Sequence, residues 1–551
     1  MFAKVSEQTM HRVRWAITSA WLLLIFSLFY DPISPWFTQP HNQLSPLRIH
    51  PEICVQVQGV CLEEKPYPLG TAIFWGGIVP LSIFILLVFG HELWRRICPL
   101  SFLSQIPRSL GWQRQRRRVF RKTAKVSQNS WLARNHAYLQ FGLLYLGLCS
   151  RILFVNSNRL ALAIFLIGTI VAAIAVGYCY GGKSWCQYFC PMAPVQKIYG
   201  EPRGLVNSKA HEDHSQTITQ SMCRVVKPDG KEQSACVACQ SPCMDIDAER
   251  SYWNGITKPE QRWLYYGYVG LVMGYFCYYY LYAGNWDYYF SGAWAHQENQ
   301  LATLLSPGFY LFDRPIGIPK LLAVPLTLGL FTIGSYLLGR KLEKRYKAYL
   351  LKQQQHLSQE QIQHRIFTLC TFFIFNFFFV FGGRPFILLL SLPWQYLYDL
   401  AIAILSTLWL YRTWGRNENL YARESLASRL RRQLSKLQLD VSRFLEGRSL
   451  EDLNADEVYV LAEVVLGFIK EKRLQAYKEV LRHTLQQGYF TAADSLEKLQ
   501  NMCQELDISN EEHQSVLGEL ATEEPKLLNP NQHNNLENWL RLELRSCTEK
   551  S

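Results

Sequence analysis

Long apolar segments recur along this chain of 551 residues, and they restrict its fold more than any other feature. A helix needs about 20 predominantly apolar residues to cross the hydrocarbon core of a bilayer. Backbone amides and carbonyls inside a membrane must bond to one another, so only helices and closed barrels span it. The sequence therefore predicts an all-α polytopic membrane protein with about eight transmembrane helices, at 13–30, 70–90, 137–156, 159–180, 263–283, 318–339, 364–382 and 386–411.

Basic residues gather beside these segments, in the regions 4–14, 95–125, 340–347 and 412–423. With eight spans, all four regions fall on one side of the lipid bilayer, which the positive-inside rule assigns to the cytoplasm. We therefore expect a multi-pass protein of the inner (cytoplasmic) membrane with both termini in the cytoplasm. The net charge of +13 then reflects membrane loops, and nucleic acid is not an expected partner.

The predicted spans divide the chain into four parts. These are four transmembrane helices with a basic cytoplasmic loop (1–180), a cysteine-rich cytoplasmic segment (181–262), four more transmembrane helices (263–412) and a helical cytoplasmic domain with a polar tail (413–551). In the last part, sequences that begin at Thr491 and Ser509 resemble helix capping boxes. Cys54 and Cys61 fall in an outer loop, where a disulfide can persist, although the sequence leaves their pairing open.

Four cysteines of the segment 181–262 are spaced as ligands of one metal centre. Cys236-x2-Cys239-x3-Cys243 is a short run, and Cys223 lies thirteen positions upstream of Cys236. Iron–sulfur clusters need converging soft thiolates, and short spacings let one loop supply three of them. Four thiolates also suit zinc, but zinc ribbons use two Cys-x2-Cys pairs, and the second pair is missing here. We therefore expect a [4Fe-4S] cluster bound in a small ferredoxin-like loop domain, with zinc as the alternative.

A second group of cysteines precedes this run. The motif Cys186-x3-Cys190-Pro follows one predicted span, and Trp94-x3-Cys98-Pro follows another, so the two read as a diverged repeat in which Trp94 replaces a cysteine. These cysteines, with Cys179, are candidate ligands of a second cluster. The alternative is that Cys98 and Cys179 are buried small apolar residues.

These motifs resemble those of membrane polyferredoxin-like proteins, the accessory electron-transfer subunits of nitrate and nitrous-oxide reduction (NapH and NosR type). The resemblance covers roughly spans two to five and the cysteine-rich loop. It implies a helical bundle that carries [4Fe-4S] clusters at its cytoplasmic face. This chain departs from that pattern because its first Cys-x3-Cys-Pro motif is reduced to Cys98-Pro99, its ferredoxin run is shorter, and it has no outer flavin-binding domain.

Two further features bear on the site. Asp245, Asp247 and Glu249 follow Cys243 directly and are expected to form a solvated helix start, although they could instead tune a cluster. The outer loop 284–317 is crowded with aromatic residues around His296. An interfacial aromatic belt is the favoured interpretation of that loop, and a quinone pocket is kept as a hypothesis.

The sequence thus predicts a membrane-bound iron–sulfur protein for electron transport. It would relay electrons through one or two [4Fe-4S] clusters, from a cytoplasmic donor or the quinone pool to another redox protein. No self-contained catalytic motif is present, so whether the chain is an enzyme stays open. The rival hypothesis is an iron–sulfur redox or oxygen sensor that signals through its C-terminal helical domain.

Overall fold

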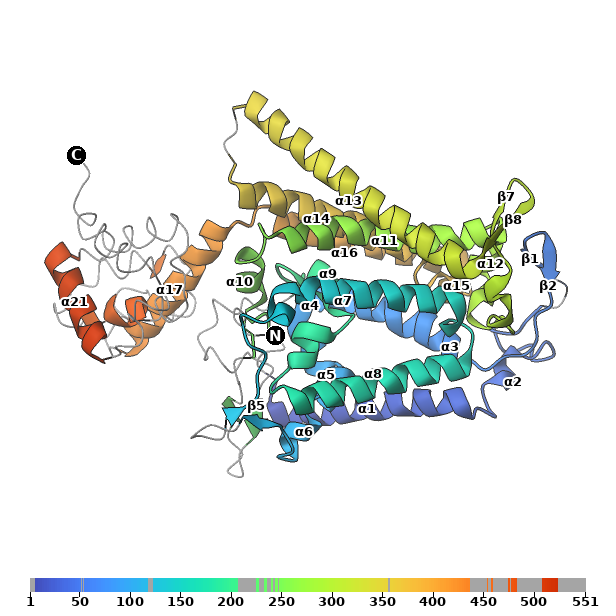
Figure 1. Cartoon of the computed structure of the whole chain (residues 1–551), viewed down its shortest axis with the longest axis horizontal. Coiled ribbons are helices and arrows are strands. Elements are labelled where there is room, and N and C mark those ends of the chain that lie inside the picture. The colour runs from blue at the N-terminus through green and yellow to red at the C-terminus, as the bar shows by residue number, and fades with distance from the viewer. Residues whose placement is uncertain are drawn as a thin grey trace. The chain divides into compact units, whose positions relative to one another are not determined.

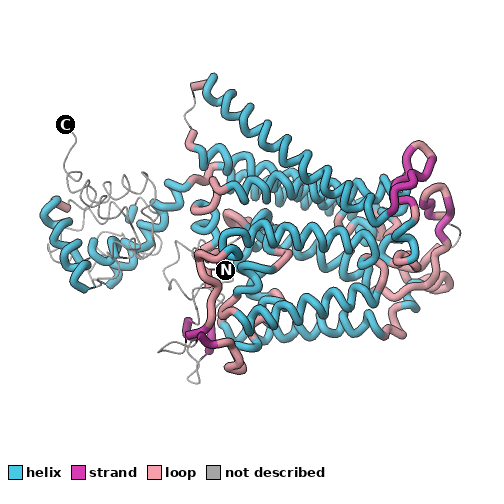
Figure 2. The backbone as a smooth tube through the Cα atoms, in the orientation of Figure 1, coloured by secondary structure: helices cyan, strands magenta, loops and turns pink. Residues whose placement is uncertain are grey.

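The chain is represented by a computed structural model, shown in Figures 1 and 2. It describes residues 5–50, 52, 54–116, 122–206, 224–226, 232–234, 239–240, 243–245, 247–354, 357–436, 453, 457–458, 474–475, 477–482 and 508–523. Two compact units are present: Met1–Ser208 with Ile218–Glu418, and Lys209–Thr217 with Asn419–Ser551. The longer segment of the second unit begins at Asn419, near the predicted boundary at 413, and its shorter segment falls within the predicted part 181–262.

The first unit is a bundle of long helices whose axes run in similar directions (Figure 1). Its long helices are α1 (Glu7–Phe29), α4 (Val79–Ile97), α7 (Trp131–Ser150), α8 (Arg159–Cys179), α11 (Pro259–Ala283), α13 (Lys320–Lys352), α14 (Gln359–Phe381) and α16 (Leu392–Trp414). Shorter helices are α2 (Pro35–Thr38), α3 (Gly70–Ala72), α5 (Pro99–Leu103), α6 (Ile106–Ser109), α9 (Ala193–Gly200), α10 (Ala248–Trp253), α12 (Asp287–Phe290) and α15 (Arg384–Ile387). Wider π-helical turns are η2 (Ile73–Ile78), η3 (Arg151–Val155) and η4 (Trp185–Phe189), and η5 (Ala293–Ala295) and η6 (Ala302–Leu305) are 3₁₀ turns.

The strands of the described residues form only two-stranded antiparallel hairpins. They are β1 (Val55–Val57) with β2 (Val60–Leu62), β3 (Gln115–Arg116) with β4 (Lys122–Thr123), β5 (Arg224–Val226) with β6 (Glu232–Ser234), and β7 (Pro307–Leu311) with β8 (Arg314–Pro319). The hairpins β1–β2 and β7–β8 lie at one end of the bundle, and α5, α6 and α10 lie at the other (Figures 1 and 2). Cys54 and Cys61 are joined by a disulfide at the first end.

Six helices of the described residues are long and apolar enough to cross a membrane: Glu7–Phe29, Gly70–Leu103, Trp131–Val155, Arg159–Cys179, Lys320–Lys352 and Gln359–Phe381. The prediction of a helical membrane protein is therefore confirmed. Helices α11 and α16 occupy the other two predicted places with 25 and 23 residues. Both carry many polar groups, tyrosines in α11 above all, so the count of eight spans and the orientation stay predictions. The predicted span 386–411 begins too early, because residues 388–391 separate α15 from α16.

Glycines let helices of the bundle approach closely. Helix α11 packs on α13, and a Cβ added at Gly270 would lie 2.0 Å from the carbonyl oxygen of Phe331. In α8, a Cβ at Gly177 would lie 2.0 Å from the carbonyl oxygen of Ser104. Small residues at such crossings are typical of membrane helix packing, because they bring backbones into van der Waals contact.

In the second unit, the structure describes α17 (Glu418–Lys436), which begins at the unit boundary, and α21 (Asn510–Glu523). The capping box predicted at Ser509 is confirmed. The Glu512 amide donates to Ser509 Oγ at 3.2 Å, and the Ser509 amide donates to the Glu512 carboxylate at 3.1 Å. The one predicted at Thr491 lies outside the described residues.

Candidate functional site: two Gly–Cys-Pro loops around Asp245

The two Cys-Pro motifs have the same backbone design. A glycine with φ +70° stands eight positions before the cysteine in both copies, at Gly90 for Cys98 and at Gly182 for Cys190. The two cysteines adopt nearly identical dihedral angles, φ −61° and ψ 119° at Cys98 and φ −60° and ψ 120° at Cys190. Only glycine adopts a positive φ at little cost, so both glycines serve as breaks between two helical stretches. The repeat proposed from the sequence is therefore present in the structure.

The two copies also complete each other's backbone hydrogen bonds. A break at Gly90 leaves the preceding carbonyls without helical donors. The amides of Leu205 and Val206, downstream of the second motif, donate to the carbonyls of Leu87 and Val88 at 2.9 and 2.8 Å. Residues downstream of the first motif do the same near Gly182, since the Arg114 amide donates to the Tyr178 carbonyl at 3.0 Å. The loops are thus interlocked.

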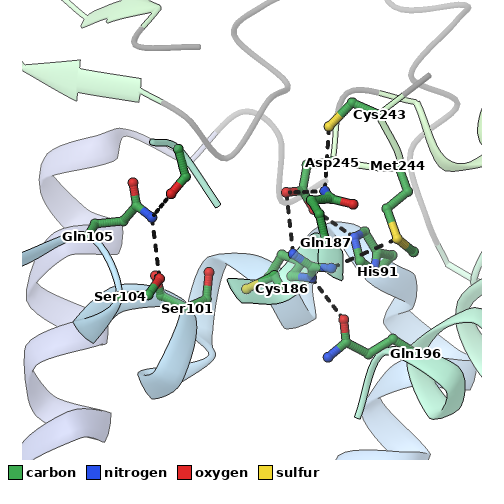
Figure 3. Close-up of polar contacts among 12 residues, drawn as sticks. His91, Ser101, Ser104, Gln105, Cys186, Gln187, Gln196, Cys243, Met244 and Asp245 are labelled. Atoms are coloured by element: carbon green, nitrogen blue, oxygen red, sulfur yellow. Dashed lines mark hydrogen bonds and ion pairs between the residues drawn. The ribbon is translucent and has the colours of Figure 1, made fainter. Parts of the chain in front are cut away.

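One buried carboxylate joins the two copies. Arg95 and Gln187 occupy equivalent positions, five residues after Gly90 and Gly182, and both donate to Asp245 Oδ2, at 3.4 and 3.3 Å. His91 Nε2 lies 2.7 Å from the other oxygen, Oδ1. Figure 3 shows His91 and Gln187 converging on Asp245.

The charges of this cluster favour an ionised Asp245. Burial by itself would raise the pKa of Asp245, but the Arg95 and Lys183 charges and the hydrogen bond from His91 outweigh it and hold the pKa well below its usual range. The Asp245 side chain is 2% exposed and that of Arg95 is 0% exposed. Two opposite charges can be buried together because each compensates the other, and removal of one partner leaves the other buried without compensation, which is strongly destabilising. The network therefore ties the cysteine-rich segment to both loops.

Two expectations about exposure are wrong. Asp247 does cap α10, since its side chain accepts from the Arg250 amide, but Asp245 and Glu249 are buried and not solvated. Arg95 and Arg96, counted among the loop charges, are buried too. The sequence gives no sign of this burial, because an acidic residue near a helix start is usually solvated and an arginine after a membrane span usually faces water.

The segment after Cys243 docks firmly on the bundle. Glu249 forms an ion pair with Arg416 at 2.8 Å. The Tyr252 hydroxyl lies 2.9 Å from His364 Nδ1, and His364 Nε2 lies 2.9 Å from the Thr413 carbonyl. These contacts hold α10 against α14 and the end of α16, so the position of Cys243 is set on both sides.

Cys239 and Cys243 lie against the second loop. Gln187 Nε2 donates to Cys243 Sγ at 3.7 Å, and the Tyr188 hydroxyl donates to the Cys239 carbonyl at 2.9 Å. Burial and both neighbouring thiols raise the pKa of Tyr188 to about 12. Cys223 and Cys236, the other two predicted ligands of this cluster, lie outside the described residues.

Three further thiols lie near enough to Arg95 to interact with its charge. The Arg95 guanidinium interacts electrostatically with Cys98, Cys186 and Cys190. Burial and the Cys186 and Cys98 thiols raise the pKa of Cys190, whereas Arg95 lowers it. Cys186 and Cys190 also share one apolar cluster with Trp185 and Ala173. Cys179, at the end of α8, is half-buried.

The described part of the chain holds no group of three or more His, Cys, Asp or Glu side chains arranged to bind a metal ion. Two of the predicted ligand thiols nevertheless have a hydrogen-bond donor or a positive charge near them. Cluster-ligating thiolates are stabilised by hydrogen-bond donors and nearby positive charge. Gln187 supplies such a donor to Cys243, and Arg95 supplies the charge beside Cys186. His91, Arg95 and Gln187 were missed as site residues because only their contacts with Asp245 mark them.

A separate cavity of about 240 Å³ opens at the end of the bundle that carries the disulfide. Among its lining residues, Tyr67 stacks on His296 with ring centroids 3.6 Å apart. His296 Nε2 lies 3.3 Å from Glu64 Oε1, and its Nδ1 is buried without a partner among the described residues. Tyr288 and Trp294, expected in an interfacial belt, are instead buried in the bundle.

The buried carboxyl group of Glu201, at the end of α9, is expected to make the free energy of unfolding depend on pH. It is 2% exposed, and no described residue bonds its Oε1. Burial raises its pKa from 4.5 to about 7, opposed by Lys197. The folded state therefore keeps a proton that the unfolded chain releases, and this term lowers stability as pH rises from 4.5 to 7. Glu201→Gln should stabilise the protein by about 3 kcal/mol at pH 8 and little at pH 4.5, measured by unfolding in detergent. Equal effects at both pH values would contradict this.

Comparison of the chain with protein-family models, with curated proteins and with solved structures finds no match in any of the three. Its function must therefore be inferred from its own residues.

Proposed function

We propose that this chain is a membrane-bound iron–sulfur electron-transfer protein. Cys223, Cys236, Cys239 and Cys243 would hold one [4Fe-4S] cluster, and Cys186 and Cys190, with Cys98, would hold another. When bound, such a cluster supplies a reversible one-electron couple. The observation that carries the proposal is the hydrogen bond from Gln187 to Cys243 Sγ, which joins the predicted ferredoxin run to the second thiol group.

The arrangement favours electron transfer between two neighbouring clusters over a single isolated cluster. The Cys239–Cys243 run contacts Gln187 and Tyr188, the two residues that follow Cys186 in the chain. Two redox centres bound on either side of the same turn would be close neighbours. The buried Asp245 network would hold them in fixed positions, and a fixed arrangement limits the reorganisation that electron transfer requires.

The cavity beside His296 suits a small membrane-soluble ligand. It combines apolar and aromatic walls with an imidazole and a carboxylate, the mixture that binds a small amphipathic ligand in a largely preformed pocket. We propose a quinol as the ligand of this cavity, which lies at the opposite end of the bundle from the cysteine loops, and a cytoplasmic protein as the direct electron donor to the clusters. The acceptor would be another redox protein that meets the opposite end of the bundle.

The test is anaerobic purification in detergent, with iron, sulfide and zinc counts and EPR spectra after addition of dithionite or a soluble quinol. We expect about four irons per cubane and reversible reduction by dithionite, and no reduction by the quinol alone. Cys243→Ser should lose about four irons, whereas the control Cys277→Ser, in α11, should keep them. Zinc in place of iron would overturn the proposal. Iron that is lost on oxidation without reversible reduction would favour the sensor instead.

A further inference from the structure

A buried lysine that the proposed function does not use lies inside the bundle. Lys320, the first residue of α13, directly follows β8 and is 2% exposed. Its Nζ donates to Gln300 Oε1 at 3.5 Å and lies 4.7 Å from the centre of the Tyr282 ring. An ionisable side chain in a membrane helix is costly, so it usually marks a functional site.

A second cation, Arg151, is buried in the same region. Its guanidinium lies 4.0 Å from the centre of the Trp75 ring, and its Nε donates to Asn156 Oδ1 at 2.9 Å. Asn156 Nδ2 in turn donates to the Tyr279 hydroxyl at 2.6 Å. The side-chain contacts described for Arg151 and Lys320 are thus with neutral groups, and aromatic rings attract a cation without neutralising its charge.

The surroundings of the two cations meet at a small cavity. Its volume is about 10 Å³, which is room for about one particle of the size of water. Its polar lining combines the partners of both cations, namely Asn156, Tyr279, Tyr282, Tyr288, Gln300 and Lys320 itself. None of the described residues that line the cavity is acidic.

The lining offers more hydrogen-bond donors than acceptors. A lysine ammonium has three donors and an asparagine amide has two. Lys320 uses one donor on Gln300, and Asn156 uses one on Tyr279, so both have donors left. The carbonyl oxygen of Gln300 already accepts from Lys320. Because buried charge is stable only when it is compensated, positive charge beside free donors favours an anion in this cavity and disfavours a cation.

We propose that this cavity binds a single small monovalent anion of halide size, with chloride as the probe that tests it. Lys320 is its charged ligand, and the Asn156 amide is a second donor. The bound anion compensates the buried positive charge and links the start of α13 to the turn after α7. Sulfate and gluconate are too large for a space of this size. The site does not depend on the proposed iron–sulfur clusters.

The test is thermal unfolding of the full-length protein in detergent, in chloride, bromide, sulfate and gluconate salts at matched ionic strength. A ligand that binds only the folded state raises the unfolding temperature as its concentration rises. We expect this rise with chloride and bromide and not with sulfate or gluconate. Equilibrium dialysis with radioactive chloride should show saturable binding of about one ion per chain, since the cavity holds one such particle.

Lys320→Met removes the charged donor and keeps most of the side-chain volume. It should weaken chloride binding by about tenfold or more, the size of effect expected for a hydrogen bond from a charged group. The matched control is Lys65→Gln, because the Lys65 side chain is 60% exposed and pairs with Glu298 outside the cavity. This control should bind chloride as the wild-type protein does.

Three results would overturn the proposal. The first is an unfolding temperature that rises equally in all four salts, because that is screening by ionic strength. The second is the absence of saturable chloride binding to the wild-type protein, which would leave the cavity to water. The third is a Lys320→Met variant that binds chloride as tightly as Lys65→Gln does. If Lys320→Met does not fold, the comparison of salts with the wild-type protein still decides between these outcomes.

Discussion

Replacing Asp245 with asparagine is expected to destabilise the protein by about 3–5 kcal/mol and to release bound iron. The change removes the charge that compensates Arg95, which is 0% exposed, and breaking a buried ion pair by removing one partner has a cost of this size. It also weakens the acceptor shared by His91 and Gln187. The measurements are the free energy of unfolding in detergent and the iron content after purification.

Two companion variants make this result specific. Asp399→Asn breaks the ion pair with Arg384, but the Asp399 side chain is 43% exposed, so the loss should stay below about 1 kcal/mol. The double change Arg95→Gln with Asp245→Asn removes both charges. It also gives the first loop the same residue, glutamine, that the second loop has at the equivalent position, Gln187. It should recover much of the stability, because a buried pair can be replaced by neutral groups at little cost. If the single variant Asp245→Asn is as stable as the wild-type protein, Asp245 does not join the two loops.

Gly177→Ala is expected to be the most disruptive of the small-to-large changes in α8. The added methyl carbon would lie 2.0 Å from the Ser104 carbonyl oxygen, a backbone atom that cannot rotate away. Overpacking typically costs about 1–3 kcal/mol, and a backbone clash at such a distance should reach the upper part of that range or exceed it. To relieve this clash, α8 would have to move away from Ser104, which follows Cys98-Pro99 closely in the chain. We therefore also expect the EPR spectra of the bound clusters to change.

Gly168→Ala is the matched control in the same helix. A Cβ there has no heavy atom within 4 Å, so the change should be neutral or stabilising by up to about 1 kcal/mol. Thermal unfolding of both variants in detergent, with their EPR spectra, measures the difference. Equal stabilities would show that α8 does not approach the Ser104 backbone.

Much of the fold follows from local pattern. Membrane-length apolar segments predicted the helices, and helices do lie at all eight predicted places. The ends of the helices were harder to predict. The break before α16 was missed because Leu388, Leu389 and Leu390 are apolar and continue the apolar run across it. The repeated Cys-Pro motif was readable in the sequence. Its matching glycines, eight positions upstream, were visible there too, but a glycine at a span end is common and carried no signal alone.

The site was only partly predictable, because burial depends on what packs against a residue. Asp245 after a cysteine run resembles a solvated helix start until α4 and η4 are placed around it. Arg95 resembles a topogenic loop charge until its partner is found 150 positions later in the chain.

The sequence by itself determined a helical membrane protein with a cysteine-rich segment and two related Cys-Pro motifs, because hydropathy, helical spacing and ligand spacing are local properties of the chain. Only the tertiary structure decided that the two motifs interlock, that one buried carboxylate joins them, and that Arg95 and Gln187, one from each motif, donate to the same oxygen of that carboxylate. Those facts depend on contacts between distant segments, and neither charge nor spacing along the chain specifies which buried charge will meet which.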